Sequence, residues 1–145
     1  MVTGVEIAGL VLGSIPLILA GLEFYAKGIA VTRRYWRFQQ ACKDLCNDLR
    51  TEYAMCRNSL QRLLIGVVQD KDMDNFLEDP RGEGWREEKF EGKLKDRLGP
   101  TYDSYIETIS RMKDTTDVFI AKLKLDASGK VCHTLVSVPH AECRK

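Results

Sequence analysis

The residue types best suited to chemistry in this chain are three spaced aspartates and a group of cysteines and histidines near the C-terminus. Asp70, Asp72 and Asp74 stand at alternate positions, as at the opening of a calcium-binding loop. Such a loop needs glycine at its sixth position and a bidentate glutamate at its twelfth, where this chain has Asn75 and Arg81. We therefore interpret the aspartates as capping acids at the start of a helix.

The C-terminal group consists of Cys132, His133, His140 and Cys143. These residues do not form the two closely spaced ligand pairs of a structural zinc site. Because both histidines of the chain lie here, the part expected to fold has no histidine to act as the base for a nucleophile. No glycine-rich phosphate loop follows a predicted strand. The sequence predicts no catalytic residue, no metal site and no cofactor, and hence a protein that is not an enzyme.

The other three cysteines, Cys42, Cys46 and Cys56, are spaced so that they share one face of a predicted helix. Thiols on an apolar helix stripe usually pack as small hydrophobic side chains. We expect them to be reduced and mostly buried, in a cytoplasmic protein.

The N-terminal segment is the most unusual part of the sequence. Sixteen residues from Ile7 to Leu22 carry no charge. A secretory signal would begin with basic residues, whereas the only early charge is Glu6. The run falls just short of the roughly 17–20 apolar residues of a spanning helix. The sequence therefore favours a helix buried inside a bundle in the resting protein, and insertion into a membrane stays open.

Small residues keep the membrane interpretation in consideration. Gly9 and Gly13 form a small-xxx-small pair, which lets apolar helices approach closely, and Gly4 and Gly21 extend the pattern. Pro16 is expected to kink or split the helix near Ser14. Leu12 lies near the middle of the run, where a charge would oppose insertion, and Glu6 and Glu23 mark its polar ends.

The rest of the chain predicts an all-α fold, a bundle of four to five helices in residues 1–130. Apolar residues recur at steps of three and four over two long helices, near 33–68 and 101–125, which we expect to pack antiparallel. The stripe on the first long helix comprises Phe38, Cys42, Leu45, Leu49, Tyr53, Cys56, Leu60, Leu63 and Val67. Short helices near 72–77 and 85–98 lie between them. Residues 131–145 differ in kind and are expected to form a flexible tail.

Charge argues against nucleic acid as a partner, because the formal net charge is only +1. The basic residues are concentrated directly after the apolar segment. This order is found where a hydrophobic element meets an anionic membrane surface. The candidate contacts to anionic lipid are Lys27, Arg33, Arg34 and Arg37.

The run GVEIAGLVLGSIPL, from Gly4 to Leu17, resembles the opening of fungal HeLo-like domains. These domains stand at the N-terminus of many fungal heterokaryon-incompatibility, prion-signalling and NLR-type proteins. Shorter strings are similar to the same group, and the resemblance covers about residues 3–130. They are LEFY at 22–25, Trp85, RLGPTY at 97–102 and LKLD at 123–126. The chain departs from the family pattern after about Val131.

The resemblance implies a bundle whose N-terminal helix is released and inserted into the plasma membrane on activation, killing the cell. It also implies homo-oligomers and a regulatory or NLR-type partner, and similarity to plant coiled-coil resistance domains and the mixed-lineage kinase-like executioner. The alternative is a soluble homotypic interaction or adaptor module in which the same helix stays in the core. Under the first reading the inserting and self-associating residues are Gly4, Glu6, Gly9, Leu12, Gly13, Pro16, Gly21 and Glu23.

Overall fold

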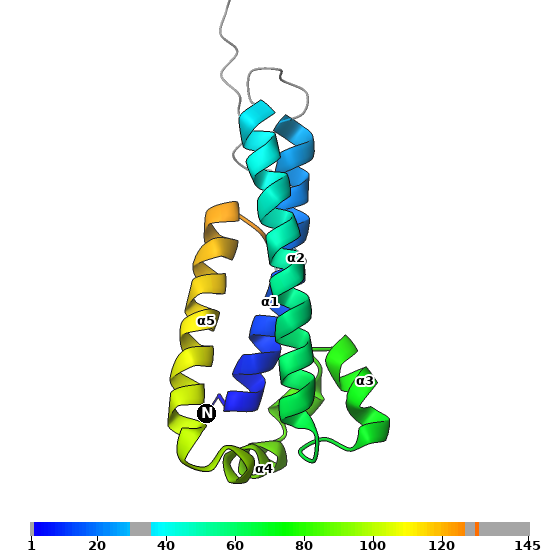
Figure 1. The fold of residues 1–145 in the computed structure, drawn as a ribbon, viewed down its shortest axis with the longest axis vertical. Helices are drawn as coiled ribbons and strands as arrows, with labels where there is room; N and C mark the ends of the chain where they lie inside the picture. The colour runs from blue at the N-terminus through cyan, green and yellow to red at the C-terminus, as the bar shows by residue number, and fades with distance from the viewer. Residues whose placement is uncertain (1, 30–35, 127–129, 131–145) are drawn as a thin grey trace, which may run out of the picture.

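The computed structural model describes residues 2–29, 36–126 and 130 (Figure 1). These residues form five α-helices and two short 3₁₀ helices, and no strand occurs among them. The elements are α1 (Gly4–Ile29), α2 (Trp36–Leu64), α3 (Asp70–Glu78), η2 (Glu83–Arg86), α4 (Glu88–Leu98), η3 (Gly99–Thr101) and α5 (Tyr102–Leu123). The predicted all-α class, with an apolar N-terminal helix, is confirmed. The tail from Val131 to Lys145, with its candidate zinc ligands, lies outside the described residues.

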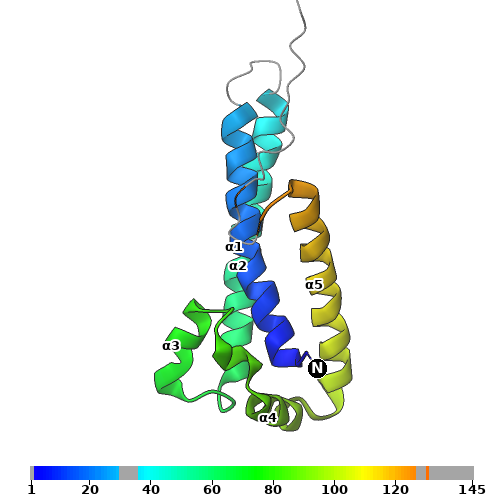
Figure 2. The ribbon, with the colours of Figure 1, turned by 180° about the vertical axis from the view of Figure 1, so that it is seen from behind.

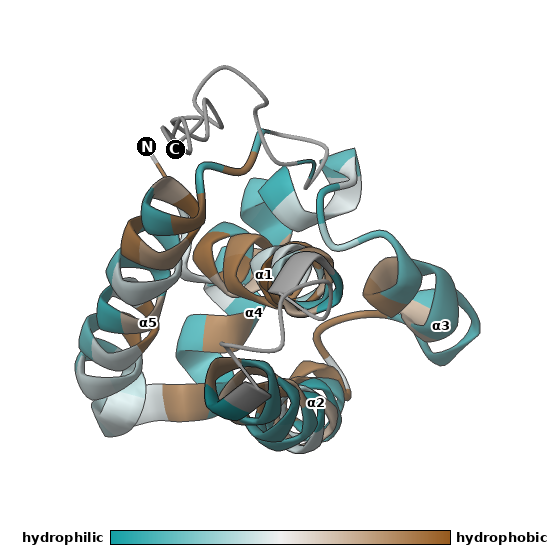
Figure 3. Cartoon of the chain, turned by 90° about the horizontal axis from the view of Figure 1, so that it is seen from above, coloured by the Kyte–Doolittle hydropathy of each residue, from teal (hydrophilic) through white to brown (hydrophobic). Residues whose placement is uncertain are grey.

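Helix α1 is the central element of the bundle. It runs between α2 and α5 along most of its length, and a view down the long axis places it in the middle with α2, α3 and α5 around it (Figure 3). It supplies eight of the nineteen buried apolar residues in the described chain. The expectation of a core helix is therefore correct, because the hydrophobic effect drives the most apolar segment to the centre.

The sequence of α1 explains both its start and its shape. Thr3 precedes the helix, and its hydroxyl accepts a hydrogen bond of 3.1 Å from the backbone N–H of Glu6, which satisfies one free donor of the first turn. Pro16 does not split the helix, which continues unbroken to Ile29. The axis of α1 instead bends about halfway along (Figure 2), as expected where proline removes one backbone hydrogen bond.

The two long outer helices, α2 and α5, run antiparallel as predicted, but each packs on α1 rather than on the other. As a result the heptad stripe of α2 is not a continuous buried seam, which corrects the sequence prediction. Leu60 is buried, whereas the side chain of Phe38 is 63% exposed and Leu45 also lies open to solvent. The stripe identifies the apolar face of α2 but does not reveal that part of this face stays exposed among the described residues.

The segment between α2 and α5 closes one end of the bundle. Trp85, in η2, is buried; its indole N–H donates a hydrogen bond of 2.8 Å to the carbonyl of Phe76, and the two rings stack with centroids 4.2 Å apart. The N-cap residue of α3 is Gln69, so neither Asp72 nor Asp74 caps this helix as the sequence suggested. Gly99, with a positive φ of 52°, ends α4 where most side chains would be strained.

Candidate functional site

Several glycines of α1 lie where a neighbouring segment packs closely against the helix backbone. A Cβ atom built on Gly9 would lie 2.6 Å from the carbonyl oxygen of Pro80 and 2.7 Å from the indole of Trp85. These distances are shorter than van der Waals contact, so only glycine allows the 80–85 loop to pack here. The close approach predicted for Gly9 is therefore used inside the monomer, against a loop.

The surroundings of Gly4, Gly13 and Gly21, which also lie in α1, differ from one another. On Gly4 a Cβ would lie 2.3 Å from Ile106 Cδ1, and on Gly21 it would lie 2.7 Å from a methyl group of Leu125. On Gly13 the nearest atom, Cγ of Arg81, would be 3.3 Å away and belongs to a flexible side chain. Gly4, Gly9 and Gly21 thus have packing reasons within the fold, whereas Gly13 is only loosely constrained.

The N-terminus of α1 is held by a carboxylate from α4. Glu91 accepts hydrogen bonds from the backbone N–H groups of Gly4, at 3.0 Å, and Val5, at 3.1 Å, one on each carboxylate oxygen. The first N–H groups of a helix have no partner within the helix, and the positive end of its dipole attracts an anion. Glu91 therefore acts as a tertiary cap that fastens α1 to α4.

Two tyrosines of α5 complete this end of the molecule. The hydroxyl of Tyr102 donates a hydrogen bond to Glu91, and that of Tyr105 donates to the carbonyl of Gly4 at 3.3 Å. Burial, followed by the hydrogen bond and the charge of Glu91, raises the pKa of Tyr102 to about 12. Burial also raises the pKa of Tyr105. Both phenols stay protonated at neutral pH and remain hydrogen-bond donors.

The other end of α1 is held mainly by α2. Glu23 forms an ion pair with Arg50, and both side chains are about half exposed. The hydroxyl of Tyr25 donates a hydrogen bond of 3.0 Å to the carbonyl of Leu123, beyond which α5 ends. Near the start of the helix, Glu6 pairs with Arg86 at 3.5 Å. The two acids that bound the apolar run therefore serve as polar attachments in this state.

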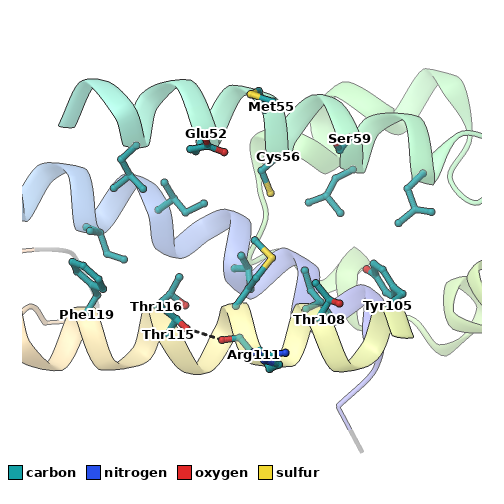
Figure 4. A pocket seen from close by; sticks show the side chains of 18 of the residues that line it. Glu52, Met55, Cys56, Ser59, Tyr105, Thr108, Arg111, Thr115, Thr116 and Phe119 are labelled. Carbon is teal, nitrogen blue, oxygen red and sulfur yellow. Dashed lines mark hydrogen bonds between the residues drawn. The ribbon is translucent and has the colours of Figure 1, made fainter. Parts of the chain in front are cut away.

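A long apolar groove opens between α2 and α5, with α1 as its floor (Figure 4). Its volume is about 970 Å³. Val11, Ile15, Ile18 and Leu22 form the floor, and the walls carry apolar residues with a polar rim. The main wall residues are Leu45, Leu49, Met55, Cys56, Leu60 and Leu63 from α2, and Tyr105, Ile109, Met112 and Phe119 from α5. The four floor residues of α1 are themselves buried, so the side chains of the walls shield α1 from solvent along the groove.

The remaining predicted site residues fall into three groups. Leu12 is fully buried, so the middle of the apolar run lies in the core. Pro16 is exposed on the outer side of α1. Lys27 and Arg37 are exposed near the ends of α1 and α2 that are joined by residues 30–35, whereas Arg33 and Arg34 lie outside the described residues.

The described cysteines and acidic residues do not form a reactive or metal-binding site. Cys46 is buried, Cys42 and Cys56 are half-buried, and all three are free, so the expectation of burial is fully met only by Cys46. Burial raises the pKa of the Cys46 and Cys56 thiols. Within the described residues, no three cysteine, histidine, aspartate or glutamate side chains gather as metal ligands.

Sequence reasoning missed Glu91, Arg50 and the groove. The Thr3-x-x-Glu6 spacing is a capping signature that marks the start of α1. No local signal identifies Glu91 as a cap, because it lies 87 residues away from Gly4. Likewise, only the tertiary structure pairs Arg50 with Glu23, 27 residues away.

No family model, curated protein or solved structure matches this chain.

Proposed function

We propose that this protein is a membrane-permeabilising effector whose α1 leaves the bundle and inserts into an anionic membrane on activation. Among the described residues, α1 is the one helix long and apolar enough to cross a bilayer, over Gly4–Lys27. Just over half of its most apolar 18-residue window is buried in the bundle. The single observation that carries the proposal is that this one span-length apolar helix forms both the core of the bundle and the floor of the groove between α2 and α5.

The contacts of α1 support release as a discrete step. α2 and α5 pack on α1 far more than on each other, so α1 can leave through the groove without first parting two packed helices. The polar attachments are confined to its ends, at Glu91 and at Arg50. Because α1 supplies so much of the core, its loss opens the remaining helices, which exposes apolar surface for oligomerisation. No catalytic step is part of this function.

A reversible crosslink between α1 and Leu125, two residues beyond the end of α5, tests this proposal. On Gly21 a built Cβ lies 3.3 Å from Cγ of Leu125, the position where a cysteine there would carry its sulfur. This is close to the separation of about 3 Å between a Cβ and the partner sulfur that an S–S bond of about 2.0 Å gives. The variant is Gly21→Cys with Leu125→Cys, made after the five native cysteines are replaced by alanine.

The oxidised variant leaves only about 17 residues of α1 free, or about 25 Å of helix, which is shorter than the roughly 30 Å hydrocarbon core. We expect dye release from anionic liposomes by the reduced protein and none by the oxidised protein. Each single-cysteine variant is the matched control and should be insensitive to oxidant. Equal leakage in both redox states contradicts insertion of α1, and so does the absence of leakage from wild-type protein at micromolar concentration.

A second candidate function is a soluble homotypic interaction module, which the groove favours. Glu52 on the α2 wall and Arg111 on the α5 wall bear opposite charges (Figure 4). A two-fold axis along the groove would place each of them against the opposite charge of a second copy. Glu52→Lys or Arg111→Glu should then weaken self-association in sedimentation equilibrium, and the double variant should restore it. A monomeric wild type at high micromolar concentration would contradict this function.

A further inference from the structure

The end of the α1–α2 pair carries a second hollow, separate from the groove and different in charge. It has a volume of about 520 Å³ and lies between the last turns of α1 and the first half of α2. Three cations line it, Lys27, Lys43 and Arg50, against one acid, Glu23. The buried side chains of Ala26 and Cys46 form its apolar floor, and the amides of Gln39 and Asn47 complete its lining.

The stretch of sequence that contributes the lining of the hollow has a basic excess. From Glu23 to Arg50 it contains six basic residues and three acidic residues. Two aromatic side chains in this region, Phe24 and Phe38, are at least half exposed. Exposed aromatic rings beside basic residues are typical of surfaces that meet a bilayer at the level of the headgroups.

Arg50 links the hollow to the attachment of α1. Its guanidinium pairs with Glu23 on α1 and also donates a hydrogen bond of 3.1 Å to the side chain of Asn47. The pair with Glu23 is half exposed, and such pairs contribute little net stability. A guanidinium binds phosphate with two parallel hydrogen bonds, so a phosphate group arriving in the hollow competes well with a single carboxylate.

We propose that this hollow binds the phosphate-bearing headgroup of an anionic phospholipid, and that binding transfers Arg50 from Glu23 to the phosphate. Lys27 and Lys43 supply the remaining charge, and Phe24 and Phe38 lie at the bilayer surface. The exchange removes the ion pair between α1 and α2 near the C-terminal end of α1. The hollow is therefore a lipid-sensing site, and this role rests on the proposed insertion of α1.

Binding is tested by co-sedimentation of the full chain with phosphatidylcholine vesicles that contain or lack phosphatidic acid. Lys43→Gln and Arg50→Gln should each weaken binding to the anionic vesicles about five-fold. The matched control is Lys71→Gln, which removes the same charge from α3, outside the hollow. Glu23→Gln should bind more tightly than wild type, since it removes the competing carboxylate. Equal losses in all three lysine and arginine variants would overturn the site in favour of a general charge effect.

The transfer of Arg50 from Glu23 to the phosphate is followed by the labelling rate of Cys46, which lies at the floor of the hollow. In a protein whose other four cysteines are replaced by serine, a polar thiol reagent should label Cys46 slowly in buffer. Labelling should speed up when anionic vesicles are added, and Glu23→Gln should label rapidly without them. The same labelling is measured with millimolar inorganic phosphate in place of vesicles, to compare a free anion with a lipid headgroup. If phosphate accelerates labelling as much as vesicles do, the site binds free anions and the lipid proposal is wrong.

Dye release separates this inference from the function on which it rests. If Lys43→Gln and Arg50→Gln leave vesicle binding and leakage unchanged while the Gly21–Leu125 crosslink blocks leakage, the hollow is not the sensor but insertion stands. If the wild type binds through the hollow and exposes Cys46 but releases no dye, the site stands and permeabilisation fails.

Discussion

The carboxylate of Glu91 accepts a hydrogen bond of 3.0 Å from the backbone N–H of Gly4, which lies 87 residues earlier in the chain. This contact places an anion from α4 at the positive end of α1. Together with the Glu23–Arg50 pair at the other end, it shows that the most apolar helix of the protein is fastened by polar groups. Hydrogen bonds and ion pairs of this kind can exchange one polar partner for another, whereas apolar packing contacts have no such specific partner to exchange.

The Glu91 cap gives the first prediction. Glu91→Ala leaves the first N–H groups of α1 without a partner and should lower the free energy of unfolding by about 0.5–2 kcal/mol. Glu91→Gln keeps an acceptor oxygen and should cost less. Urea denaturation followed by circular dichroism measures both. If α1 inserts on activation, Glu91→Ala should also leak at a lower protein concentration than wild type, and identical unfolding curves for all three proteins would contradict the cap.

The two central glycines of α1 should respond differently to the same methyl group. Gly9→Ala forces a Cβ against Pro80 and Trp85 and should destabilise the protein by about 1–3 kcal/mol. Gly13→Ala meets only the flexible side chain of Arg81 and should be neutral or stabilising by up to about 1 kcal/mol, because alanine favours the helix. Thermal unfolding distinguishes the two, and an equal loss at both positions would show that the packing of the 80–85 loop is not the cause.

Pro16 offers a test of insertion that spares the fold. From the sequence alone, Leu12 is the position where an added charge would oppose insertion. Leu12 is fully buried, however, so a glutamate there would unfold the bundle. Pro16 is exposed and lies in the middle of Gly4–Lys27. Pro16→Glu should leave the soluble protein folded but oppose insertion by about 2.5–3.5 kcal/mol.

The matched control for that variant is Pro16→Ala, which removes the same helix bend without adding a charge. We expect Pro16→Ala to release dye from anionic liposomes and Pro16→Glu to release little, with equal circular dichroism in solution. If the folded Pro16→Glu protein leaks as well as Pro16→Ala, the membrane-spanning role of α1 is refuted.

Tyr102 predicts a specific loss of stability in alkali. Its pKa in the folded protein is raised from 10.0 to about 12, so its contribution to stability is fully present below pH 10 and is lost as the pH rises from 10 toward 12. Thermal melts across this range should therefore show a steeper decline for wild type than for Tyr102→Phe. Parallel declines would mean that the phenol does not titrate differently in the folded and unfolded states.

Much of the fold follows from the sequence alone. The uncharged run from Ile7 to Leu22 indicates a buried helix, because no other segment carries so much apolar surface to remove from water. The three-and-four spacing of apolar residues similarly predicts α2 and α5, and Gly99 with Pro100 predicts the break between α4 and α5. These features depend on residues within a few helical turns in the sequence, so the periodicity of apolar residues predicts them.

The tertiary structure alone decided how these helices use their surfaces. It placed Gly9 against Trp85, Gly4 against Glu91 and Glu23 against Arg50, and it left Phe38 and Leu45 exposed on the apolar stripe of α2. Periodicity identifies which face of a helix is apolar, but it carries no information about what covers that face. The partner of each residue is fixed by the packing of segments far apart in the chain, where shape and charge must fit simultaneously.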